Sequence, residues 1–271
     1  MITFIPVGGL ANRMRSINAV ASLANEFNQE PLRIFWFKDQ GLNCLFKDLF
    51  EPITIRNIQL KEASTIDQII FDRPRTKNLH LPRIFQKVLF DSCIYEQDSR
   101  DVCFDYLSWK QHTPRAYIAS FTQFYPSKYP MKELFTPLPS IKKEIEAACT
   151  PFTSHTIGIH IRRSDHTAAI HKSPTEAFIM QMEKELEQHE SVSFFIASDS
   201  EEDKQKLKKR FGNRIITLNH PTQRNSSEGI KNAVIDMYTL AGTQKIFGSF
   251  GSSYSEIAAQ IGNCKLITIT Q

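Results

Sequence analysis

The apolar positions at the start of the chain change period twice, and so predict three successive elements. Residues 2–7 (ITFIPV) form a short apolar run that predicts a buried strand, and RIFWF at 33–37 predicts another. Between them, residues 10–27 predict a helix with one apolar side. That side consists of Leu10, Met14, Ile17, Ala21 and Ala24. With Gly8 and Gly9 as the turn before the helix, the segment forms a β-α-β unit.

The second half of the chain shows the same alternation more clearly. Five apolar runs predict strands, at 156–161, 193–197, 214–218, 245–247 and 265–269. We expect one helix to begin at Pro174, with a capping box from Ser173 to Glu176. We expect the last helix to be capped from Ser253 to Glu256. Alternating strands and helices predict a parallel, doubly wound sheet whose ligands bind beyond the carboxyl ends of its strands.

The middle of the chain, roughly residues 40–135, is less regular, and we expect only short helices there. Five of the 13 prolines lie between Pro114 and Pro139, which places a domain boundary at about 136–151. A chain of 271 residues is long enough for two modest domains. We therefore predict two α/β domains, residues 1–140 and 141–271.

Composition and charge narrow the class of protein. Hydrophobic residues at 41% and charged residues at 23% are ordinary globular values, which exclude a collagen-like or mostly disordered chain. The 33 basic and 29 acidic residues are dispersed, and a net charge of +4 disfavours a general nucleic-acid binder. Five scattered cysteines without a C-x-x-C pair indicate neither a disulfide framework nor a zinc ribbon.

The chain carries no readable membrane or export signal. Its apolar runs are far shorter than the about 20 residues that a transmembrane helix needs. The first residues contain no basic segment and cleavage site typical of a secretory signal. We therefore expect no transmembrane segment and a cytoplasmic location.

The segment HIRRSD at 160–165 follows a predicted strand. Because side chains alternate along a strand, His160 and Arg162 share one face and Arg163 points to the other. A guanidinium at a strand end can bind a phosphate through two hydrogen bonds, so Arg162 is the candidate for the main phosphate contact. The alternative is that both arginines form surface ion pairs with Asp165 and its neighbours.

Two other predicted strand ends carry candidate groups. At 248–255 the segment GSFGSSYS leads into the last helix, where Ser252, Ser253 and exposed amides would attract anionic oxygens. The alternative is a serine-capped helix without a ligand. Ser198 and Asp199 end another strand, where the carboxylate suits ribose hydroxyls or a purine amine. Asp199 is equally suited to capping the helix that follows.

The glycine turn begins the segment GGLANR at 8–13, where Gly8 and Gly9 allow the backbone to approach a ligand. The segment is not G-x-G-x-x-G, so the nicotinamide fingerprint is missing. The sequence has no D-x-D pair to hold a divalent ion, and its histidines lack the spacing of metal ligands, so we predict no metal site. It also has no G-x-S-x-G and no P-loop, which disfavours hydrolases and P-loop nucleotidases.

These four segments resemble the GDP-fucose-dependent fucosyltransferases, a superfamily that includes α-1,2-, α-1,6- and protein O-fucosyltransferases. HIRRSD at 160–165 is similar to their H-x-R-R-x-D segment, in which an arginine holds the donor diphosphate. GGLANR at 8–13 resembles their early G-G-L-G-N-Q loop, and Ser198-Asp199 resembles their strand-end Thr/Ser-Asp. GSFGSSYSE at 248–256 is similar to their late serine-rich segment. The segments occur in the family's order and near its spacing.

The resemblance implies a GT-B glycosyltransferase with two Rossmann-like, doubly wound domains and a cleft between them. It implies that residues 1–140 bind the acceptor and residues 141–271 bind the nucleotide sugar. The implied reaction is an inverting transfer of fucose from GDP-fucose to a hydroxyl of a glycan acceptor, without a metal or other cofactor. Arg162 is then the catalytic residue. The donor contacts expected from the resemblance are His160, Arg162, Arg163, Asp165, Ser198, Asp199, Ser252, Ser253, Gly8, Gly9 and Asn12.

The sequence also departs from the family pattern. Ala11 and Arg13 stand where the α-1,2 enzymes have glycine and glutamine. Protein O-fucosyltransferases place a base in this loop, whereas Asn12 and Arg13 offer no carboxylate, so the general base is not selected. We expect Arg163 and Asp165 to form a supporting pair. Two alternatives remain open: a glycosyltransferase that uses another nucleotide sugar, and a non-catalytic nucleotide-sugar or glycan-binding protein with the same fold.

Overall fold

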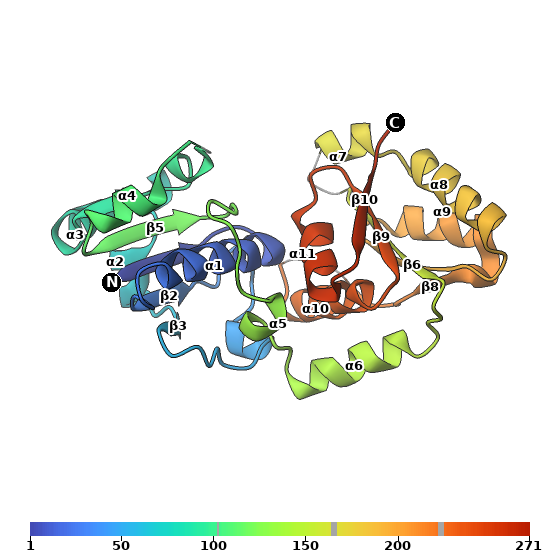
Figure 1. Ribbon diagram of the computed structural model, residues 1–271, viewed down its shortest axis with the longest axis horizontal. Coiled ribbons are helices and arrows are strands. Elements are labelled where there is room, and N and C mark those ends of the chain that lie inside the picture. The colour runs from blue at the N-terminus through green and yellow to red at the C-terminus, as the bar shows by residue number, and fades with distance from the viewer. Residues whose placement is uncertain (102, 164–166, 222–224) are drawn as a thin grey trace. The chain divides into compact units, whose positions relative to one another are not determined.

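In the computed structural model the chain forms two compact units, Met1–Thr136 and Pro137–Gln271, which are described one at a time (Figure 1). The structure describes residues 1–101, 103–163, 167–221 and 225–271. Within these residues each unit contains a parallel sheet of five strands. Parallel neighbours need a crossover connection, which helices supply here. No helix in the described residues is long and apolar enough to cross a membrane.

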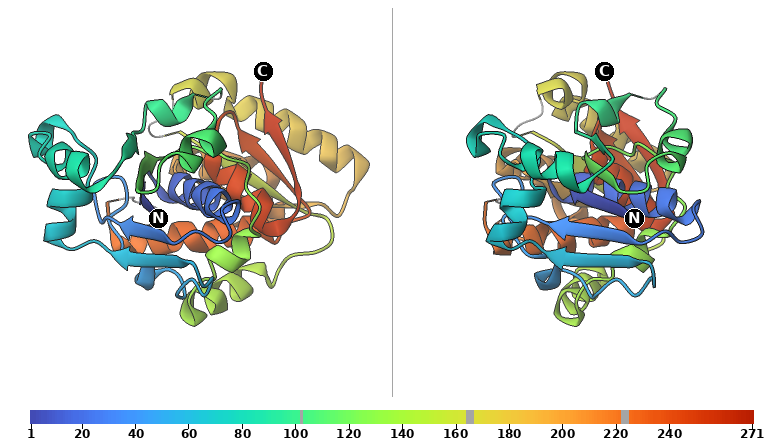
Figure 2. Two further views of the ribbon diagram at one scale, coloured as in Figure 1. Left: turned by 60° about the vertical axis from the view of Figure 1, so that its left-hand side comes forward. Right: turned by 90° about the vertical axis from the view of Figure 1, so that its left-hand side faces the viewer.

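The N-terminal sheet has the strand order β3-β2-β1-β5-β4, so the first strand is its centre (Figure 2). Its strands are β1 (Ile2–Pro6), β2 (Leu32–Trp36), β3 (Ile58–Glu62), β4 (Ser92–Ile94) and β5 (Ala116–Ser120). Its helices are α1 (Leu10–Asn25), α2 (Thr65–Phe71), α3 (Pro82–Leu89), α4 (Tyr106–Gln111) and α5 (Met131–Leu134). Three short 3-10 turns, η1 (Phe46–Asp48), η2 (Thr76–Asn78) and η3 (Asp98–Arg100), lie between them.

The N-terminal core has two layers. The predicted apolar side of α1, from Leu10 to Ala24, is buried and α1 packs on β1. A separate cluster contains Phe35, Phe90 and Tyr117 from β2, the end of α3 and β5. Each large side chain that is fully buried contributes about 1.5–3 kcal/mol. A sheet covered on both faces explains why its central strands are mostly apolar.

The C-terminal sheet has the strand order β10-β9-β6-β7-β8. Its strands are β6 (Thr156–Ile161), β7 (Ser193–Ser198), β8 (Ile215–Thr217), β9 (Lys245–Ser249) and β10 (Lys265–Ile269). Its helices are α6 (Pro139–Cys149), α7 (Thr167–Lys172), α8 (Thr175–Gln188), α9 (Glu201–Phe211), α10 (Ser227–Ala241) and α11 (Ser253–Gly262), with a 3-10 turn η4 (Gly212–Arg214). Strand β6 is central, and its neighbours β7 and β9 lie far apart in sequence.

The side chains of β6 divide the C-terminal core into two layers. Ile157, Ile159 and Ile161 pack in a cluster with Phe178 of α8 and residues of α9. The alternate positions face α10 and α11: a Cβ on Gly158 would lie 2.9 Å from Leu240 Cδ2 of α10. Helices on both faces make the sheet doubly wound, as the sequence predicts.

The predicted strands at both ends of the chain are confirmed as β1, β2 and β6–β10. The expectation of only short helices in residues 40–135 is wrong, because β3, β4 and β5 lie there and complete the first sheet. Strand β4 is three residues long, too short to show a period, and β5 is buried at all five positions, so it shows no alternation of apolar and polar residues.

The two predicted helix caps are also wrong. Helix α8 begins at Thr175 after Pro174, and no side chain caps it. Ser173 is fully buried instead: its Oγ donates to the Ile269 carbonyl at 2.6 Å and accepts from the Phe250 amide at 2.8 Å. In α11 the residue before the helix is Ser252 rather than Ser253, and it makes no side-chain cap bond.

Candidate functional site

Most of the predicted site residues meet at the carboxyl edge of the C-terminal sheet. The register of β6 pairs His160 with Gly248 of β9, and Ile161 with Ser198 of β7. The residues that follow β6 therefore lie between the ends of its two neighbours. Residues 160–163, the Ser-Asp segment and the serine-rich segment, which are far apart in sequence, become adjacent here.

Arg162 is held between the ends of β9 and β7. Its amide donates to Ser249 Oγ at 2.9 Å, and its Nη1 donates to Asp199 Oδ2 at 2.5 Å. The side chains of Arg162 and Asp199 are 11% and 17% exposed. The other oxygen of Asp199 accepts from the Arg163 amide at 2.8 Å. One carboxylate therefore holds the loop after β6 through both of its oxygens.

Arg163 points to the other side of the sheet, as the strand alternation predicts. Its Nε donates to Asp203 Oδ2 at 2.9 Å, and its Nη2 donates to Thr175 Oγ1 at 3.0 Å. These partners lie on α9 and α8, so Arg163 fastens the strand end to two helices. The expected partner, Asp165, lies outside the described residues.

His160 supports the first turn of α11 from below. The side chain is buried, and its Nδ1 lies 2.7 Å from Ser255 Oγ and 3.3 Å from Ser252 Oγ. The ring stacks on Tyr254 at a centroid distance of 4.6 Å. Tyr254 in turn donates from its hydroxyl to the Ala233 carbonyl of α10 at 2.5 Å. Through these contacts His160 fixes where the amides at the start of α11 lie.

Two glycines allow α11 to begin this close to the sheet. A Cβ on Gly248 would lie 2.6 Å from Ser255 Oγ and 2.7 Å from Ser255 Cβ, which is closer than real side chains approach. Gly251 has a φ of +65°, a left-handed conformation that favours glycine. The glycines of the predicted serine-rich segment therefore serve the packing of the helix start.

The remaining predicted residues of this unit lie at the same edge. Ser198 is buried, and its Oγ accepts from the Ser200 amide at 3.1 Å, which shapes the turn after β7. Ser200 then caps α9, the role that the sequence left open for Asp199. Ser253 is half-buried and is the first residue of α11.

In the N-terminal unit, Gly8, Gly9 and Asn12 lie at the carboxyl edge of the other sheet, after β1. Gly8 has a φ of +84°, and a Cβ there would lie 3.1 Å from Asn12 Nδ2. Gly9 precedes the first residue of α1. The turn is therefore tight enough to need Gly8, and Asn12 packs beneath it.

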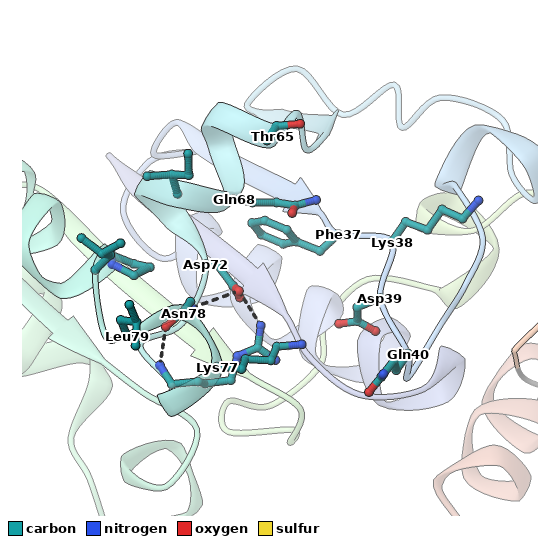
Figure 3. A pocket seen from close by; sticks show the side chains of 14 residues that line it. Phe37, Lys38, Asp39, Gln40, Thr65, Gln68, Asp72, Lys77, Asn78 and Leu79 are labelled. Carbon is teal, nitrogen blue, oxygen red and sulfur yellow. Dashed lines mark hydrogen bonds and ion pairs between the residues drawn. The ribbon is translucent and has the colours of Figure 1, made fainter.

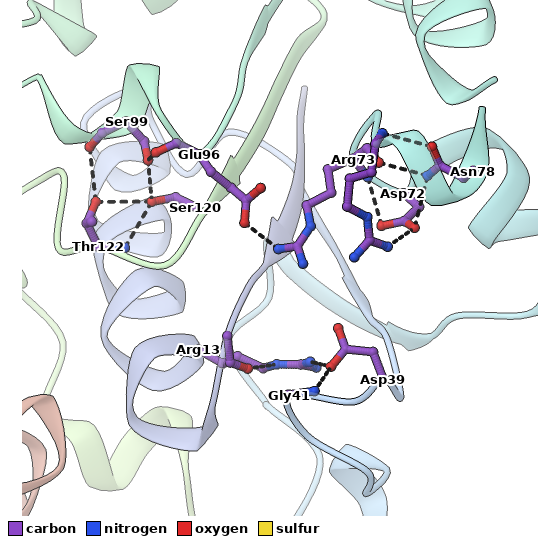
Figure 4. A network of polar contacts seen from close by, with 12 residues as sticks. Arg13, Asp39, Gly41, Asp72, Arg73, Asn78, Glu96, Ser99, Ser120 and Thr122 are labelled. Atoms are coloured by element: carbon purple, nitrogen blue, oxygen red, sulfur yellow. Dashed lines mark hydrogen bonds and ion pairs between the residues drawn. The ribbon is translucent and has the colours of Figure 1, made fainter. Parts of the chain in front are cut away.

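Arg13, the loop's departure from the family pattern, is fully buried. Its Nε donates to the Gly8 carbonyl at 2.8 Å, its Nη1 to the Phe37 carbonyl, and its Nη2 to Asp39 Oδ1 at 3.0 Å (Figure 4). Burial lowers the pKa of Arg13 to about 10 against the attraction of Asp39, so the guanidinium stays charged at neutral pH. One cation therefore ties the glycine turn to the loop after β2.

Asp39, the partner of Arg13, also holds the loop that follows β2. Its Oδ1 also accepts from the amides of Gly41 and Leu42, at 2.8 Å and 3.1 Å, and its side chain is 24% exposed. The same unit contains two more ion pairs between a carboxylate and an arginine (Figure 4). Glu96, after β4, pairs with Arg73, and Asp72, after α2, pairs with Arg75.

A pocket of about 550 Å³ lies within the N-terminal unit. It is lined by residues 37–40 after β2, by one side of α2, and by residues from Asp72 to Pro82 (Figure 3). Its walls combine the ring of Phe37 and the side chain of Leu79 with the charged groups of Asp39 and Lys77. A mixed polar and apolar lining suits a ligand that carries both hydroxyl groups and flat apolar faces.

Sequence reasoning missed the groups that hold the predicted residues in place. In the C-terminal unit these are Ser249, Tyr254 and Asp203, and in the N-terminal unit Asp39 is the main omission. A signal for Asp39 exists, because it follows β2 as the glycine turn follows β1, and parallel strands end at the same edge. In the part of the chain that the structure describes, no three His, Cys, Asp or Glu side chains are grouped so as to hold a metal ion.

Solved structures share this architecture over almost the whole chain. NodZ α-1,6-fucosyltransferase soaked with GDP-fucose matches with a TM-score of 0.65 and 16% identity, over 96% of this chain and 92% of that chain. NodZ comes from Bradyrhizobium. POFUT1 in complex with GDP matches with a TM-score of 0.61 and 12% identity, over 99% and 97%. A mutant of FUT1 from Arabidopsis thaliana in complex with GDP matches with a TM-score of 0.62 and 16% identity, over 98% of this chain and 69% of that chain.

The chain has the fold of the GDP-fucose-dependent fucosyltransferases. The predicted α/β architecture of the GT-B class is thereby confirmed, with one parallel sheet in each unit. No protein-family model and no curated protein matches the sequence, so the likeness rests on structure.

Proposed function

We propose that the chain is an inverting glycosyltransferase that moves fucose from GDP-fucose to a hydroxyl group of a glycan acceptor, without a metal ion. The observation that supports this proposal most is that Arg162, Asp199 and the start of α11 meet at one edge of the sheet, in a chain with this fold. The resemblance assigns these three motifs to the donor. We assign the C-terminal unit to GDP-fucose and the N-terminal unit to the acceptor.

The chemistry requires positive charge where the diphosphate leaves. As the acceptor oxygen bonds to the anomeric carbon, the bond from that carbon to the β-phosphate oxygen breaks and GDP takes the electron pair. Arg162 would meet the new negative charge, exchanging Asp199 for a phosphate oxygen. Ser252, Ser253 and the first amides of α11 would add neutral donors, and one preorganised donor is worth about 3 kcal/mol in the transition state.

The exchange gives Asp199 a second role. While Arg162 binds Asp199 Oδ2, the Arg163 amide holds Oδ1. When Arg162 turns to a diphosphate, Oδ2 loses that partner and Oδ1 keeps its own. The carboxylate would then accept a hydrogen bond from a ribose hydroxyl or a guanine amine without changing place.

On the acceptor side, Asp39 is the group we assign to activate the attacking hydroxyl. It lines the pocket of the N-terminal unit and is fastened to the glycine loop through Arg13. Among the described residues, the three hydrogen bonds given for its side chain all end on Oδ1. A general base must lie within hydrogen-bond reach of the proton it takes, and an acceptor glycan in this pocket would meet that condition.

Replacing Arg162 tests the donor site. We expect Arg162→Ala to lower turnover of GDP-fucose by about 10² or more. Arg162→Lys should lower it less, because lysine keeps the positive charge but cannot form the bidentate hydrogen bonds of arginine. Arg210→Ala is the matched control, since it removes an exposed arginine from α9. Titration calorimetry with GDP and turnover with GDP-, UDP- and CMP-linked sugars, each with and without EDTA, give the readouts.

Three outcomes would contradict the donor proposal: no binding of GDP at millimolar concentration, equal turnover in Arg162→Ala and Arg210→Ala, or loss of turnover in EDTA. Preference for a UDP- or CMP-linked sugar would move the assignment to another glycosyltransferase. Donor binding without turnover on a broad glycan array would instead indicate a binding protein.

Asp39→Asn tests the acceptor side. Asparagine keeps an oxygen to accept from Gly41 and Leu42 but loses the charge that pairs with Arg13 and cannot take a proton. At a temperature where calorimetric unfolding shows the variant to be folded, we expect GDP affinity to stay and turnover to fall by about 10²–10⁴. Glu96→Gln is the control, because it changes the neighbouring carboxylate pair in the same way. If only the Glu96 variant loses turnover, then Asp39 holds the loop and Glu96 is the base. Burial raises the pKa of Glu96, which suits a proton acceptor.

A further inference from the structure

Helix α3 and the segments beside it expose large apolar side chains to solvent. Leu79 is 80% exposed, Val88 72% and Ile84 63%, values that are unusual for side chains of this kind. The exposed set consists of Ile66, Ile69, Leu79, Leu81, Ile84, Phe85, Val88 and Leu89, and we call it the α3 surface. The pocket wall brings Ile69, Leu79 and Leu81 together, which joins α2 to the start of α3.

The amphipathic pattern of α3 is inverted. Its uncharged polar residue, Gln86, is fully buried, while Ile84, Phe85 and Val88 are exposed. Gln86 Nε2 donates to the Asp72 carbonyl at 2.9 Å, and its Oε1 accepts from the Tyr95 hydroxyl at 2.9 Å. Because the buried amide is bonded, the helix is seated in a specific orientation. The hydrogen bonds of Gln86 therefore keep the apolar side chains of α3 on the outside.

The part of the α3 surface that follows α2 is basic in sequence, although Arg73 and Arg75 are paired with Glu96 and Asp72. Residues 73–90 contain five cations, Arg73, Arg75, Lys77, Arg83 and Lys87, and no aspartate or glutamate. Lys77, Arg83 and Lys87 are exposed. Arg83 and Lys87 belong to α3 and directly precede the exposed apolar residues Ile84 and Val88. A helix surface of apolar side chains with lysine and arginine beside them is the pattern of an interfacial membrane helix.

We propose that the α3 surface binds the surface of an anionic lipid bilayer. Ile84, Phe85 and Val88 would enter the boundary between headgroups and acyl chains, while Arg83 and Lys87 would contact anionic headgroups. We choose a bilayer of acidic lipids as the partner because it combines an apolar interior with negatively charged headgroups, which match the apolar side chains and the cations of the α3 surface. The inference does not depend on the proposed transfer reaction, because the side chains that would enter or contact the bilayer do not line the acceptor pocket; these are Arg83, Ile84, Phe85, Lys87 and Val88.

Sedimentation with vesicles tests the proposal on the full chain. We expect binding to vesicles of phosphatidylglycerol and phosphatidylcholine, little binding to phosphatidylcholine alone, and weakening of the binding as salt is raised. Arg83→Gln with Lys87→Gln should weaken partition by about 30-fold, since each cation near an anionic surface contributes about 1 kcal/mol. Ile84→Asn with Val88→Asn should weaken it by at least about 10-fold.

Matched controls come from the C-terminal unit. Met180→Asn replaces an exposed apolar side chain of α8, and Lys208→Gln with Lys209→Gln removes two exposed cations from α9. Both control variants should bind vesicles as the parent chain does. All changed positions are exposed, so far-ultraviolet circular dichroism should be the same for every variant.

Two results would overturn the proposal. One is equal vesicle binding, or equal absence of binding, in the parent and the α3 variants. The other is a dimer by light scattering that becomes a monomer in Ile84→Asn with Val88→Asn and does not bind vesicles, because a second copy of the chain would then cover the surface. Failure of the fucosyl-transfer assay would leave the vesicle result unaffected.

Discussion

Replacing Gly248 by alanine tests whether the start of α11 forms part of the donor site. The added Cβ would lie 2.7 Å from Ser255 Cβ, whereas ordinary contacts are 3.4–4 Å. The first turn of α11 must therefore shift by about 0.7–1.3 Å, an overpacking that costs about 1–3 kcal/mol of stability. A displacement of about 1 Å at positioned donors lowers turnover by about 10². We expect turnover to fall by that factor and GDP affinity by about 10-fold.

A matched variant separates the local effect from general destabilisation. Gly158→Ala lies on β6, and its Cβ would meet Thr243 Oγ1 at 2.7 Å and Leu240 Cδ2 at 2.9 Å. These contacts involve α10 and the turn after it, not the start of α11. Calorimetric unfolding should show similar losses of stability for both variants, while GDP titration should show a loss only for Gly248→Ala.

The refuting result is specific. If Gly248→Ala is destabilised as expected but binds GDP and turns over as well as the parent chain, the first turn of α11 does not contact the donor. If Gly158→Ala loses affinity to the same degree, the loss in both variants reflects the packing of the unit as a whole. In either case the diphosphate must be bound without the serine-rich segment.

Two further predictions concern stability. Burial opposes ionisation of Asp67, but hydrogen bonds from Ser64 outweigh the effect of burial and lower the pKa of Asp67. The charged carboxylate therefore stabilises the folded state above about pH 4, and this stabilisation is lost as the pH falls through the pKa of Asp67 in the folded protein. Asp67→Asn should lower the melting temperature at pH 7, and scanning calorimetry should show the difference shrinking below pH 4; a constant difference would contradict this cause. Ser173→Ala leaves the Phe250 amide and the Ile269 carbonyl without their partner, so urea unfolding should show a loss of about 1–3 kcal/mol, and an unchanged midpoint would mean that those groups find other partners.

The C-terminal unit could be predicted from sequence because its signals are local. Each strand from β6 to β10 is an apolar run, and the helices between them are long enough to show their period. The carboxyl ends of parallel strands meet at one edge of the sheet, so the sequence predicts that Arg162, Asp199 and Ser252 lie close together. The hydrogen-bond partners of these side chains depend on strand register and on rotamers, so the bond from Arg162 to Asp199 cannot be predicted from the sequence.

The N-terminal unit was harder because its signals are tertiary. Strand β3 lies at the edge of its sheet and has only two apolar residues, Ile58 and Leu60. Strand β5 follows Pro114 within an aromatic-rich stretch in which no alternation is visible. The caps failed for a similar reason: Ser173 bonds two backbone groups distant in sequence instead of its own helix. The inverted pattern of α3 becomes visible only once Gln86 is seen to be buried.

The burial of Arg13 constrains how the sequence of this protein can change over generations. A substitution at Arg13 alone would leave two carbonyls and the Asp39 carboxylate without their common donor. A substitution at Asp39 alone would leave a cation in the interior without its counter-ion. Descendant sequences should therefore keep both residues or exchange both, so the two positions form a single inherited unit.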